Sequence, residues 1–273
     1  MKRYGLAGYP LGHSMSPVIH QRLSALEDGE DSRYRLLEIP PDRFDTSIKE
    51  MFELDGFNIT IPHKLAIIPH LDRLDRSAEK YRAVNTVKCD GRIGYNTDVE
   101  GFRRSVESLG ISSFAGTRVL ILGSGGTGRM AAIESASGGA ELTIAVRESG
   151  LAKAEQLRGE IYTDTGKRVI ITTHGNISGE FDLLVNTTPA GMYPDINKCC
   201  IGEDIIKKCV NVFDVIYNPA ETMLMRIARS HGIRVCGGMT MLVWQAAAAR
   251  TIWNGARYNP DDIAAIIESI GVK

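Results

Sequence analysis

The glycine-rich stretch after residues 119–122 constrains the fold of this chain more than any other feature. The apolar run Val-Leu-Ile-Leu at these positions leads directly into a turn with the spacing G-x-G-x-x-G, made of Gly123, Ser124, Gly125, Gly126, Thr127 and Gly128. The apolar run predicts a buried strand, and residues 129–136 are suited to a helix. A strand, a glycine turn and a helix in this order direct backbone N–H groups at an anion such as a dinucleotide pyrophosphate. The same glycine spacing also occurs in ordinary tight turns, and the preceding strand is what favours a nucleotide site.

Strand-length apolar segments alternate with helix-like segments along most of the chain. This alternation predicts right-handed β-α-β crossovers and a mostly parallel sheet. At 273 residues the chain is long enough for two domains. We therefore expect a two-domain α/β protein. A doubly wound, Rossmann-type dinucleotide-binding domain would span 106–237, and an α/β substrate domain would span 1–105 and be completed by the C-terminal helices of 238–273.

Charge and hydropathy exclude several classes of partner. The 32 Lys and Arg residues nearly balance the 33 Asp and Glu residues, so the net charge is −1. No global field therefore attracts nucleic acid or an anionic membrane. No apolar run approaches the roughly 18 to 20 residues of a membrane helix, and the N-terminus begins as a strand instead of a signal peptide. We expect a cytoplasmic protein, a monomer or homodimer, with a small-molecule partner.

The cysteines indicate no metal centre. There are five of them, without a CxxC pair and without a histidine at ligand spacing. These spacings argue against a zinc site, and we expect no metal. An odd number of thiols also argues against a disulfide framework.

Polar side chains gather where predicted strands end. Residues 56–61 read as a strand with Asn58 and Thr60 on one side and apolar residues on the other, and Lys64 follows it. Ligands of open α/β sheets bind outside the carboxyl ends of strands, which makes these three polar residues candidates for a site. A lysine in this position is also compatible with the solvated start of a helix.

Two further polar clusters support a site of this kind. Asn85 lies inside the apolar run 83–87, and Asn96-Thr97-Asp98 follows a predicted hairpin at 91–94. Asp98 is also placed to do no more than cap the helix predicted over 99–109.

Two serines stand before the first predicted helix. Ser14 and Ser16 precede Pro17, and serine followed by proline is ordinary chemistry for the start of a helix, here predicted over 17–26. By themselves, both serines are therefore explained as helix caps.

The strand predicted over 141–146 is followed by Arg147 and Glu148. In dinucleotide-binding domains an acidic side chain at this point bonds the ribose 2′-hydroxyl of NAD, whereas an arginine accommodates the 2′-phosphate of NADP. Arg147 favours NADP, and Glu148 keeps NAD possible. A solvated surface pair is the remaining alternative.

Taken together, these segments resemble the shikimate dehydrogenase family, including its relatives that use quinate. The resemblance extends from residue 8 to residue 245, nearly the whole chain. Each motif alone is unspecific, and their joint order and spacing carry the resemblance. The motifs are Gly-His-Ser-Met-Ser-Pro at 12–17, Asn-Ile-Thr-Ile-Pro-His-Lys at 58–64, Ala-Val-Asn-Thr at 83–86, Asn-Thr-Asp at 96–98, the glycine loop, Asn-Thr-Thr-Pro-Ala-Gly-Met at 186–192, Asp-Val-Ile-Tyr-Asn-Pro at 214–219 and Met-Leu-Val-Trp-Gln at 241–245.

The resemblance implies roles for individual residues. Lys64 and Asp98 would form the catalytic pair, and Tyr217 would lie near a substrate carboxylate. That carboxylate would be held by Ser14 and Ser16, while the ring hydroxyls and carbonyl region would be bound by Asn58, Thr60, Asn85, Asp98 and Gln245. Cofactor contacts would come from the six glycine-loop residues, Arg147, Thr187, Thr188, Pro189, Val215, Gly238 and Met241. By spacing alone, the apolar group around Met241 is typical of core packing.

The resemblance also implies a reaction, the reversible NADP-dependent reduction of 3-dehydroshikimate to shikimate on the route to chorismate and the aromatic amino acids. The nicotinamide carries the hydride, and the protein positions the carbonyl and exchanges one proton. The Lys64 ammonium would stabilise the developing alkoxide, with Asp98 alongside to orient it. Which of the two formally transfers the proton stays open.

Two positions depart from the family pattern. The family often has Asn-Arg-Thr where this chain has Val146-Arg147-Glu148, which weakens the preference for NADP over NAD. The common phenylalanine before the lysine is His63, a change that could alter the pH profile and leaves the catalytic pair in place. The alternatives are a quinate/shikimate dehydrogenase using NAD or NADP and a catalytically silent paralogue that binds a shikimate-like ligand. Retention of both Lys64 and Asp98 argues against the silent paralogue.

Overall fold

The computed structural model describes residues 1–12, 14–27 and 31–271, which form two compact units. The first unit contains Met1–Glu100 and Val243–Ile270, and the second contains Gly101–Leu242. Helices α4 (Asp98–Glu107) and α9 (Gly238–Asn254) each begin in one unit and end in the other. The domain limits predicted from the sequence, 1–105 with 238–273 and 106–237, stay a prediction. His13, which belongs to one of the motifs, lies outside the described residues.

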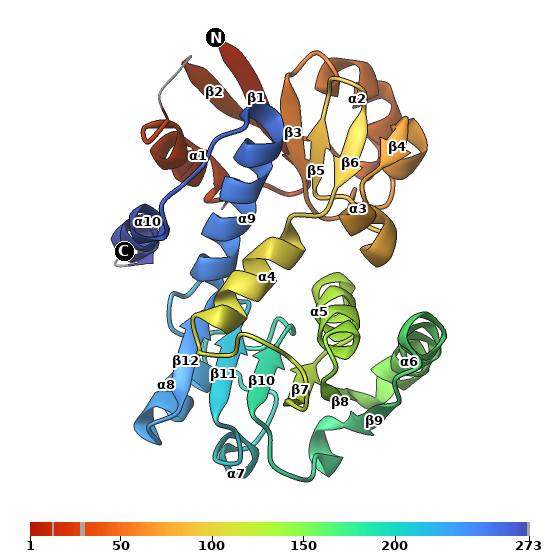
Figure 1. The fold of residues 1–273 in the computed structure, drawn as a ribbon, viewed down its shortest axis with the longest axis vertical. Coiled ribbons are helices and arrows are strands. Elements are labelled where there is room, and N and C mark those ends of the chain that lie inside the picture. The colour runs from red at the N-terminus through yellow and green to blue at the C-terminus, as the bar shows by residue number, and fades with distance from the viewer. Residues whose placement is uncertain (13, 28–30, 272–273) are drawn as a thin grey trace. The chain divides into compact units, whose positions relative to one another are not determined.

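The sheet of the first unit is mixed, with the strand order β2-β1-β3-β5-β6-β4 (Figure 1). β1 pairs in parallel with β2 and β3, and β4 pairs in parallel with β6. β5 runs antiparallel to both β3 and β6, and the β5–β6 pair is the predicted hairpin. The strands are β1 (Lys2–Gly8), β2 (Ser32–Glu38), β3 (Gly56–Ile59), β4 (Arg73–Leu74), β5 (Thr86–Lys88) and β6 (Ile93–Tyr95).

The two faces of this sheet differ in chemistry. One face packs an apolar core against α2 and α3, to which β3 contributes Phe57 and β5 contributes Val87. The opposite face carries Asn58 and Thr86, because side chains alternate along a strand and these two residues are paired in register. The helices of this unit, besides the parts of α4 and α9, are α1 (Ser16–Ser24), α2 (Phe44–Met51), α3 (Arg76–Tyr81) and α10 (Pro260–Gly271), with 3-10 turns at Pro41–Arg43 and Ile68–His70.

Helix α9 packs on the polar face of the sheet at a glycine. A Cβ atom at Gly56 would lie 2.4 Å from the indole of Trp253, so the missing side chain lets α9 approach β3. Trp253 in turn stacks on Tyr4 of β1, with ring centroids 4.5 Å apart. Its indole N–H donates to the carbonyl of Val87 at 2.9 Å.

The second unit has an entirely parallel sheet with the order β12-β11-β10-β7-β8-β9. The chain starts at the central strand β7, moves outward to β9, and returns to build β10 to β12 on the other side. This doubly wound order confirms the predicted Rossmann-type fold. The strands are β7 (Arg118–Leu122), β8 (Glu141–Val146), β9 (Val169–Thr173), β10 (Leu183–Asn186), β11 (Asn211–Asp214) and β12 (Arg234–Gly237).

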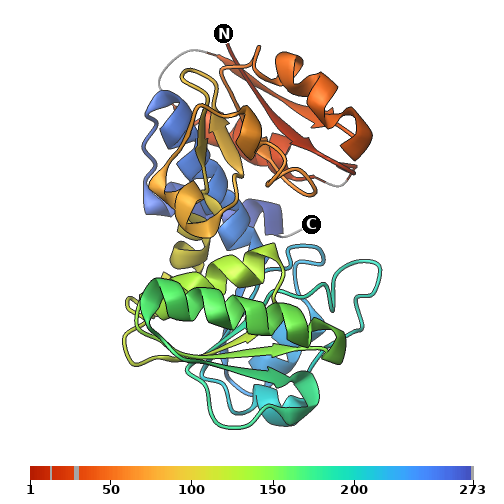
Figure 2. The same ribbon diagram turned by 90° about the vertical axis from the view of Figure 1, so that its right-hand side faces the viewer.

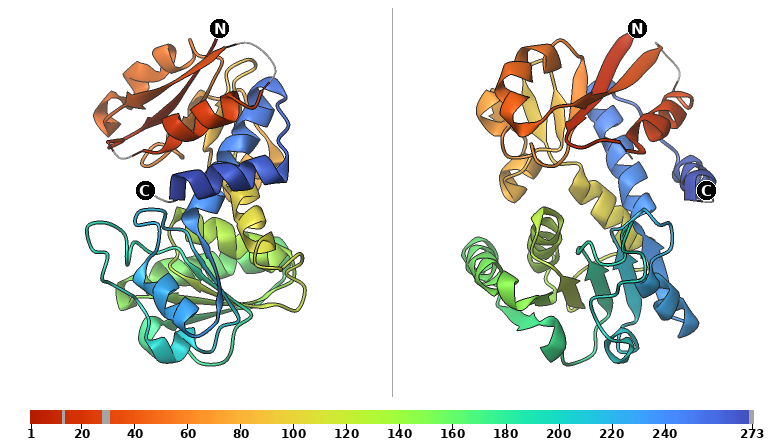
Figure 3. Two further views of the ribbon diagram at one scale, coloured as in Figure 1. Left: turned by 90° about the vertical axis from the view of Figure 1, so that its left-hand side faces the viewer. Right: turned by 180° about the vertical axis from the view of Figure 1, so that it is seen from behind.

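Helices cover both faces of this parallel sheet. Figures 2 and 3 show α5 (Gly126–Ser137) and α6 (Leu151–Thr165) on one face, and α7 (Glu203–Ile206) and α8 (Met223–Ser230) on the other. Short 3-10 turns occupy Glu148–Gly150 and His174–Asn176. Because it is covered on both faces, β7 is apolar and buried from Val119 to Leu122.

Several element boundaries differ from those predicted. The helix expected from residue 129 already begins at Gly126, inside the glycine loop. The predicted serine caps are wrong for α1, because its N-cap position is Met15 and no side chain caps it. No helix in the described part of the chain combines the length and apolar character needed to cross a bilayer.

Candidate active site

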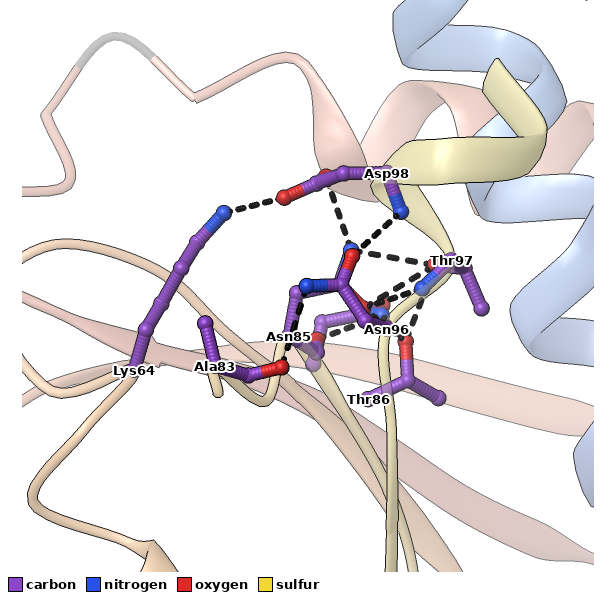
Figure 4. Close-up of polar contacts among 8 residues, drawn as sticks. Lys64, Ala83, Asn85, Thr86, Asn96, Thr97 and Asp98 are labelled. Atoms are coloured by element: carbon purple, nitrogen blue, oxygen red, sulfur yellow. Dashed lines mark hydrogen bonds and ion pairs between the residues drawn. The ribbon is translucent and has the colours of Figure 1, made fainter. Parts of the chain in front are cut away.

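Lys64 and Asp98 form an ion pair in the first unit. Lys64 lies in the turns after β3, and Asp98 is the first residue of α4, 34 residues further along the chain. The Lys64 ammonium donates to Asp98 Oδ2, and the two side chains are only 28% and 18% exposed (Figure 4). Partly buried charges are screened less than surface charges. The two residues predicted to be catalytic are thus in direct contact, as a partly buried ion pair.

Asn85 holds the second carboxylate oxygen of Asp98. Its Nδ2 donates to Asp98 Oδ1 at 2.8 Å, and its Oδ1 accepts the backbone N–H of Thr97 at 2.7 Å (Figure 4). Because a backbone N–H can only donate, Oδ1 must face Thr97, and Nδ2 must therefore face Asp98. Each carboxylate oxygen of Asp98 thus has its own donor.

Asn96 secures the start of α4. Its Oδ1 accepts the backbone N–H of Asp98 at 3.2 Å, and its Nδ2 donates to the carbonyl of Ala83 at 3.0 Å (Figure 4). The carboxylate of Asp98 itself bonds Lys64 and Asn85. Asp98 therefore does more than cap the helix, which was the alternative that the sequence left open.

The other predicted polar residues after β1 and β3 lie at one sheet edge, because adjacent parallel strands end on the same side. A Cβ at Gly8 would lie 2.4 Å from Thr60 Cγ2, which shows how closely the two strand ends approach. Ser14 Oγ accepts the N–H of Ser16 at 3.3 Å.

Gln245 and Tyr217 belong to different units. Gln245 lies on the part of α9 within the first unit and is 9% exposed. Tyr217 follows β11 in the second unit, and burial raises the pKa of its hydroxyl.

The glycine loop has the shape required for a dinucleotide. Gly123 has φ +99°, which favours glycine, and a Cβ at Gly128 would lie 2.5 Å from the Gly123 carbonyl oxygen. By contrast, Cβ atoms at Gly125 and Gly126 would have no heavy atom within 4 Å among the described residues. Helix α5 has no side-chain cap and no acidic residue in its first turn. These residues fit a pyrophosphate at the helix N-terminus.

The remaining predicted cofactor residues follow the carboxyl ends of other strands of the second sheet. Thr187 Oγ1 donates to the Leu122 carbonyl at 2.7 Å, and Arg147 is exposed just after β8. Gly238 packs against Val215, whose carbonyl oxygen would lie 2.1 Å from a Cβ at this position. Met241 is buried, and its carbonyl oxygen would lie 2.4 Å from a Cβ at Gly101.

Asp214 supports the loop that carries Thr187, Thr188 and Pro189. Its Oδ1 accepts from Asn186 Nδ2 at 3.0 Å, and Asn186 Oδ1 accepts both the N–H and the hydroxyl of Thr188. Asp214 Oδ1 also accepts the N–H of Ile216, and its Oδ2 accepts the hydroxyl of Thr222. Burial of this carboxyl, which has no exposed surface, raises its pKa from 3.8 to about 6.

The raised pKa of Asp214 predicts a pH-dependent stability. Between pH 4 and 6 the folded state keeps a proton that the unfolded state releases, so the free energy of unfolding falls as the pH rises through this window. Asp214→Asn keeps a hydrogen-bonding amide and removes the charge. The stability of this variant relative to wild type should increase by about 2 kcal/mol between pH 4 and 7. Urea unfolding at both pH values measures this, and parallel pH profiles would contradict it.

Four residues that were not predicted as site residues form hydrogen bonds to Asn85 or Asn58. Thr86 and Thr97 bond Asn85, and their places within the motifs 83–86 and 96–98 were a signal that could have identified them. His20 and Tyr34 bond Asn58, and nothing in their local sequence indicates this.

His63 belongs to the packing of the first unit. Its ring stacks on Phe44 with centroids 4.3 Å apart, and its Nε2 bonds the Ile39 carbonyl at 2.6 Å. Within the residues that the structure describes, no group of three or more His, Cys, Asp or Glu side chains is arranged to hold a metal ion.

Comparison with known proteins shows which family the chain is similar to. Residues 6–87 match the family described as shikimate dehydrogenase substrate binding domain. The chain is 40% identical to a shikimate dehydrogenase (NADP(+)) of Shouchella clausii over 264 residues, which covers 94% of each protein.

Solved structures extend the similarity to the whole fold. A crystal structure of shikimate dehydrogenase in complex with NADP+ has a TM-score of 0.90 and 33% identity, and the match covers 100% of this chain and 96% of the other. The shikimate 5-dehydrogenase of Thermus thermophilus in complex with NADP(H) and shikimate has a TM-score of 0.82 and 29% identity, with coverage of 98% and 99%. By full-length sequence identity and by fold, this chain belongs to the shikimate dehydrogenase family.

Proposed function

We propose that this protein is an NADP-dependent shikimate dehydrogenase, which reversibly reduces 3-dehydroshikimate to shikimate on the route to chorismate. The observation that carries the proposal is the Lys64–Asp98 ion pair held by Asn85, in a chain that belongs to this family. Lysine and carboxylate in contact are suited to polarise a carbonyl and to exchange a proton.

The substrate would bind at the edge of the first sheet. Ser14 and Ser16 supply hydroxyl donors for its carboxylate, and the family resemblance assigns Tyr217 to the same carboxylate. Thr60 and Gln245 hydrogen-bond its ring. Asn85 has a donor beside Asp98, and its bond to the Thr97 hydroxyl, 3.0 Å long, can be exchanged for a substrate hydroxyl. Asn58 differs from Asn85 in its partners, because its amide bonds Tyr34, His20, Asn85 and Thr86, whereas the Asn85 amide bonds Asp98 directly.

The chemical roles of the pair follow from its geometry. When bound, the nicotinamide cofactor would supply the hydride for reduction of the carbonyl and would take it up in the reverse reaction. The Lys64 ammonium stabilises the negative charge that develops on the carbonyl oxygen, and the proton for that oxygen comes from the Lys64–Asp98 pair. Asp98 orients the ammonium and bonds a substrate hydroxyl.

The cofactor would lie along the carboxyl edge of the second sheet. The N–H groups at the start of α5 hold the pyrophosphate, and Gly125 and Gly126 leave room for it. Arg147 binds the 2′-phosphate. Thr187, Thr188, Pro189, Val215, Gly238 and Met241 complete the set of cofactor contacts.

An initial-rate matrix of shikimate and quinate against NADP and NAD tests the proposal. We expect the highest kcat/KM for shikimate with NADP. Comparable rates with quinate, or a preference for NAD, would support the quinate/shikimate dehydrogenase instead. Shikimate binding without turnover with either cofactor would identify a silent binding protein.

Replacing Arg147 tests the choice of cofactor. Arg147→Ala should raise the KM for NADP much more than the KM for NAD, because only NADP carries the 2′-phosphate. Arg168→Ala is a matched control, since Arg168 is an exposed arginine just before β9 in the same unit. Equal effects of Arg147→Ala on both cofactors would show that Arg147 does not bind the phosphate. The cytoplasmic location and the monomeric or homodimeric state stay predictions.

A further inference from the structure

The amide of Asn58 uses all four of its hydrogen-bonding positions within the protein. Its Nδ2 donates to the Asn85 carbonyl at 3.2 Å and to Thr86 Oγ1 at 2.9 Å. Its Oδ1 accepts from the Tyr34 hydroxyl at 2.8 Å and bonds His20 Nε2 at 3.1 Å. An amide has two donor hydrogens and two acceptor lone pairs, so none remains for a substrate.

The orientation of this amide is determined by one partner. The Asn85 carbonyl can only accept, so Nδ2 must face it and Oδ1 must face His20. His20 Nε2 therefore carries a proton and donates it. Burial is the largest reason why the pKa of His20 is lowered to about 3, so the ring stays neutral at physiological pH.

Aromatic packing holds these partners in place. The His20 ring stacks on Tyr34 with centroids 4.0 Å apart and an interplanar angle of 11°, and on Trp253 with centroids 5.5 Å apart. Asn58 is itself only 5% exposed. The amide is thus bonded to groups whose own positions are fixed by packing.

From Asn58 a chain of donors leads to the catalytic carboxylate. Thr86 Oγ1 accepts from Asn58, so its own hydrogen is available for Asn85 Oδ1 at 3.1 Å or the Thr97 hydroxyl at 3.1 Å. Asn85 Nδ2 then donates to Asp98 Oδ1, and Asp98 Oδ2 accepts from Lys64 (Figure 4). Asn85 is therefore hydrogen-bonded to Asp98, and it also forms hydrogen bonds with Asn58 and Thr86.

We propose that Asn58 is a positioning residue, which orients Asn85 and through it the Lys64–Asp98 pair, and makes no hydrogen bond to the substrate. This inference rests on the proposed function, because it assigns Asn58 a part in the same reaction. It revises the substrate-binding role that the family resemblance implied for Asn58. A residue that acts in this way affects the rate of the reaction and leaves substrate affinity nearly unchanged.

The test measures kcat and KM for substitutions at Asn58 and at Thr86, which are neighbours in this series of hydrogen bonds. Asn58→Ala should lower kcat about tenfold or more and leave the KM for shikimate within about threefold, because displaced catalytic groups lose rate while substrate contacts remain. Thr86→Val removes only the hydroxyl between Asn58 and Asn85, and it should show the same pattern. Thr86→Ser keeps the hydroxyl and should restore kcat toward the wild-type value.

A buried threonine elsewhere provides the matched control. Thr143 lies on β8 of the second unit and is 9% exposed, so Thr143→Val tests the general effect of removing a buried hydroxyl. Its kcat and KM should equal those of the wild type. Circular dichroism establishes that each variant is folded, and if Asn58→Ala is not, the two threonine variants decide the question.

Three outcomes would overturn the proposal. A KM increase of about tenfold with kcat retained in Asn58→Ala would make Asn58 a substrate ligand. Wild-type kcat in Asn58→Ala or in Thr86→Val would show that the chain of bonds does not serve catalysis. Equal impairment of Thr86→Ser and Thr86→Val would indicate packing instead of the hydroxyl. The rate matrix of the wild type tests the proposed function. The kcat and KM of each variant relative to the wild type, measured with the best substrate of that matrix, test the positioning role separately.

Discussion

Replacing Lys64 with alanine should lower kcat by about 10² to 10³-fold and change the KM for shikimate far less, which corresponds to about 2.7 to 4 kcal/mol of transition-state stabilisation. The reason is that the ammonium meets full negative charge only when the carbonyl oxygen becomes an alkoxide. The ground-state carbonyl gains little from it. Steady-state kinetics with shikimate and NADP at several pH values measures both constants.

Another lysine of the first unit serves as the control for this substitution. Lys49 is exposed on α2, and Lys49→Ala should leave both constants at their wild-type values. A large KM increase with kcat retained in Lys64→Ala would mean that Lys64 only binds substrate. Its role in stabilising the developing alkoxide would then have to be given up.

Asp98→Ala should impair both kcat and KM, because Asp98 is proposed to do two things. It accepts from Lys64 and from Asn85, so its removal releases the lysine and takes away one of the two acceptors of Asn85 Nδ2. It also bonds a substrate hydroxyl, and that contact exists in the ground state as well as in the transition state. Asp98→Asn, which keeps the size of the side chain, should retain more substrate affinity than Asp98→Ala.

The double variant Lys64→Ala with Asp98→Ala tests whether the two residues act as one unit. Residues that act together lose their shared contribution once, so the double variant should be little worse in kcat than the poorer single variant. Kinetics of the wild type, the two single variants and the double variant give the coupling energy. Fully additive losses would show that Lys64 and Asp98 work independently, and the paired role would be wrong.

Local sequence was sufficient for the kind and order of most elements. The apolar run 119–122 and the glycines after it predicted β7, its turn and α5, because burial on both faces and positive φ impose their residue types over a few positions. The predicted hairpin at 91–94 is the β5–β6 pair, and its turn also contains residues with positive φ. Boundaries were less well predicted. Residues 126–128 were expected to be loop and belong to α5, since a helix can begin on glycines when the preceding strand holds its start.

The sequence by itself determined the family, the Rossmann-type order and the residues that could carry the chemistry, since these depend on motifs of a few residues each. Only the tertiary structure decided which of them touch. Lys64 meets Asp98 across 34 residues, and Asn58 of β3 meets His20 of α1 across 38, and no local pattern encodes either contact. Whether a polar side chain remains available to a substrate depends on how many partners the fold brings to it. Asn58 carries the same amide as Asn85, and only the fold separates their partners, since Asn58 bonds Tyr34, His20 and Thr86 whereas Asn85 bonds the carboxylate of Asp98.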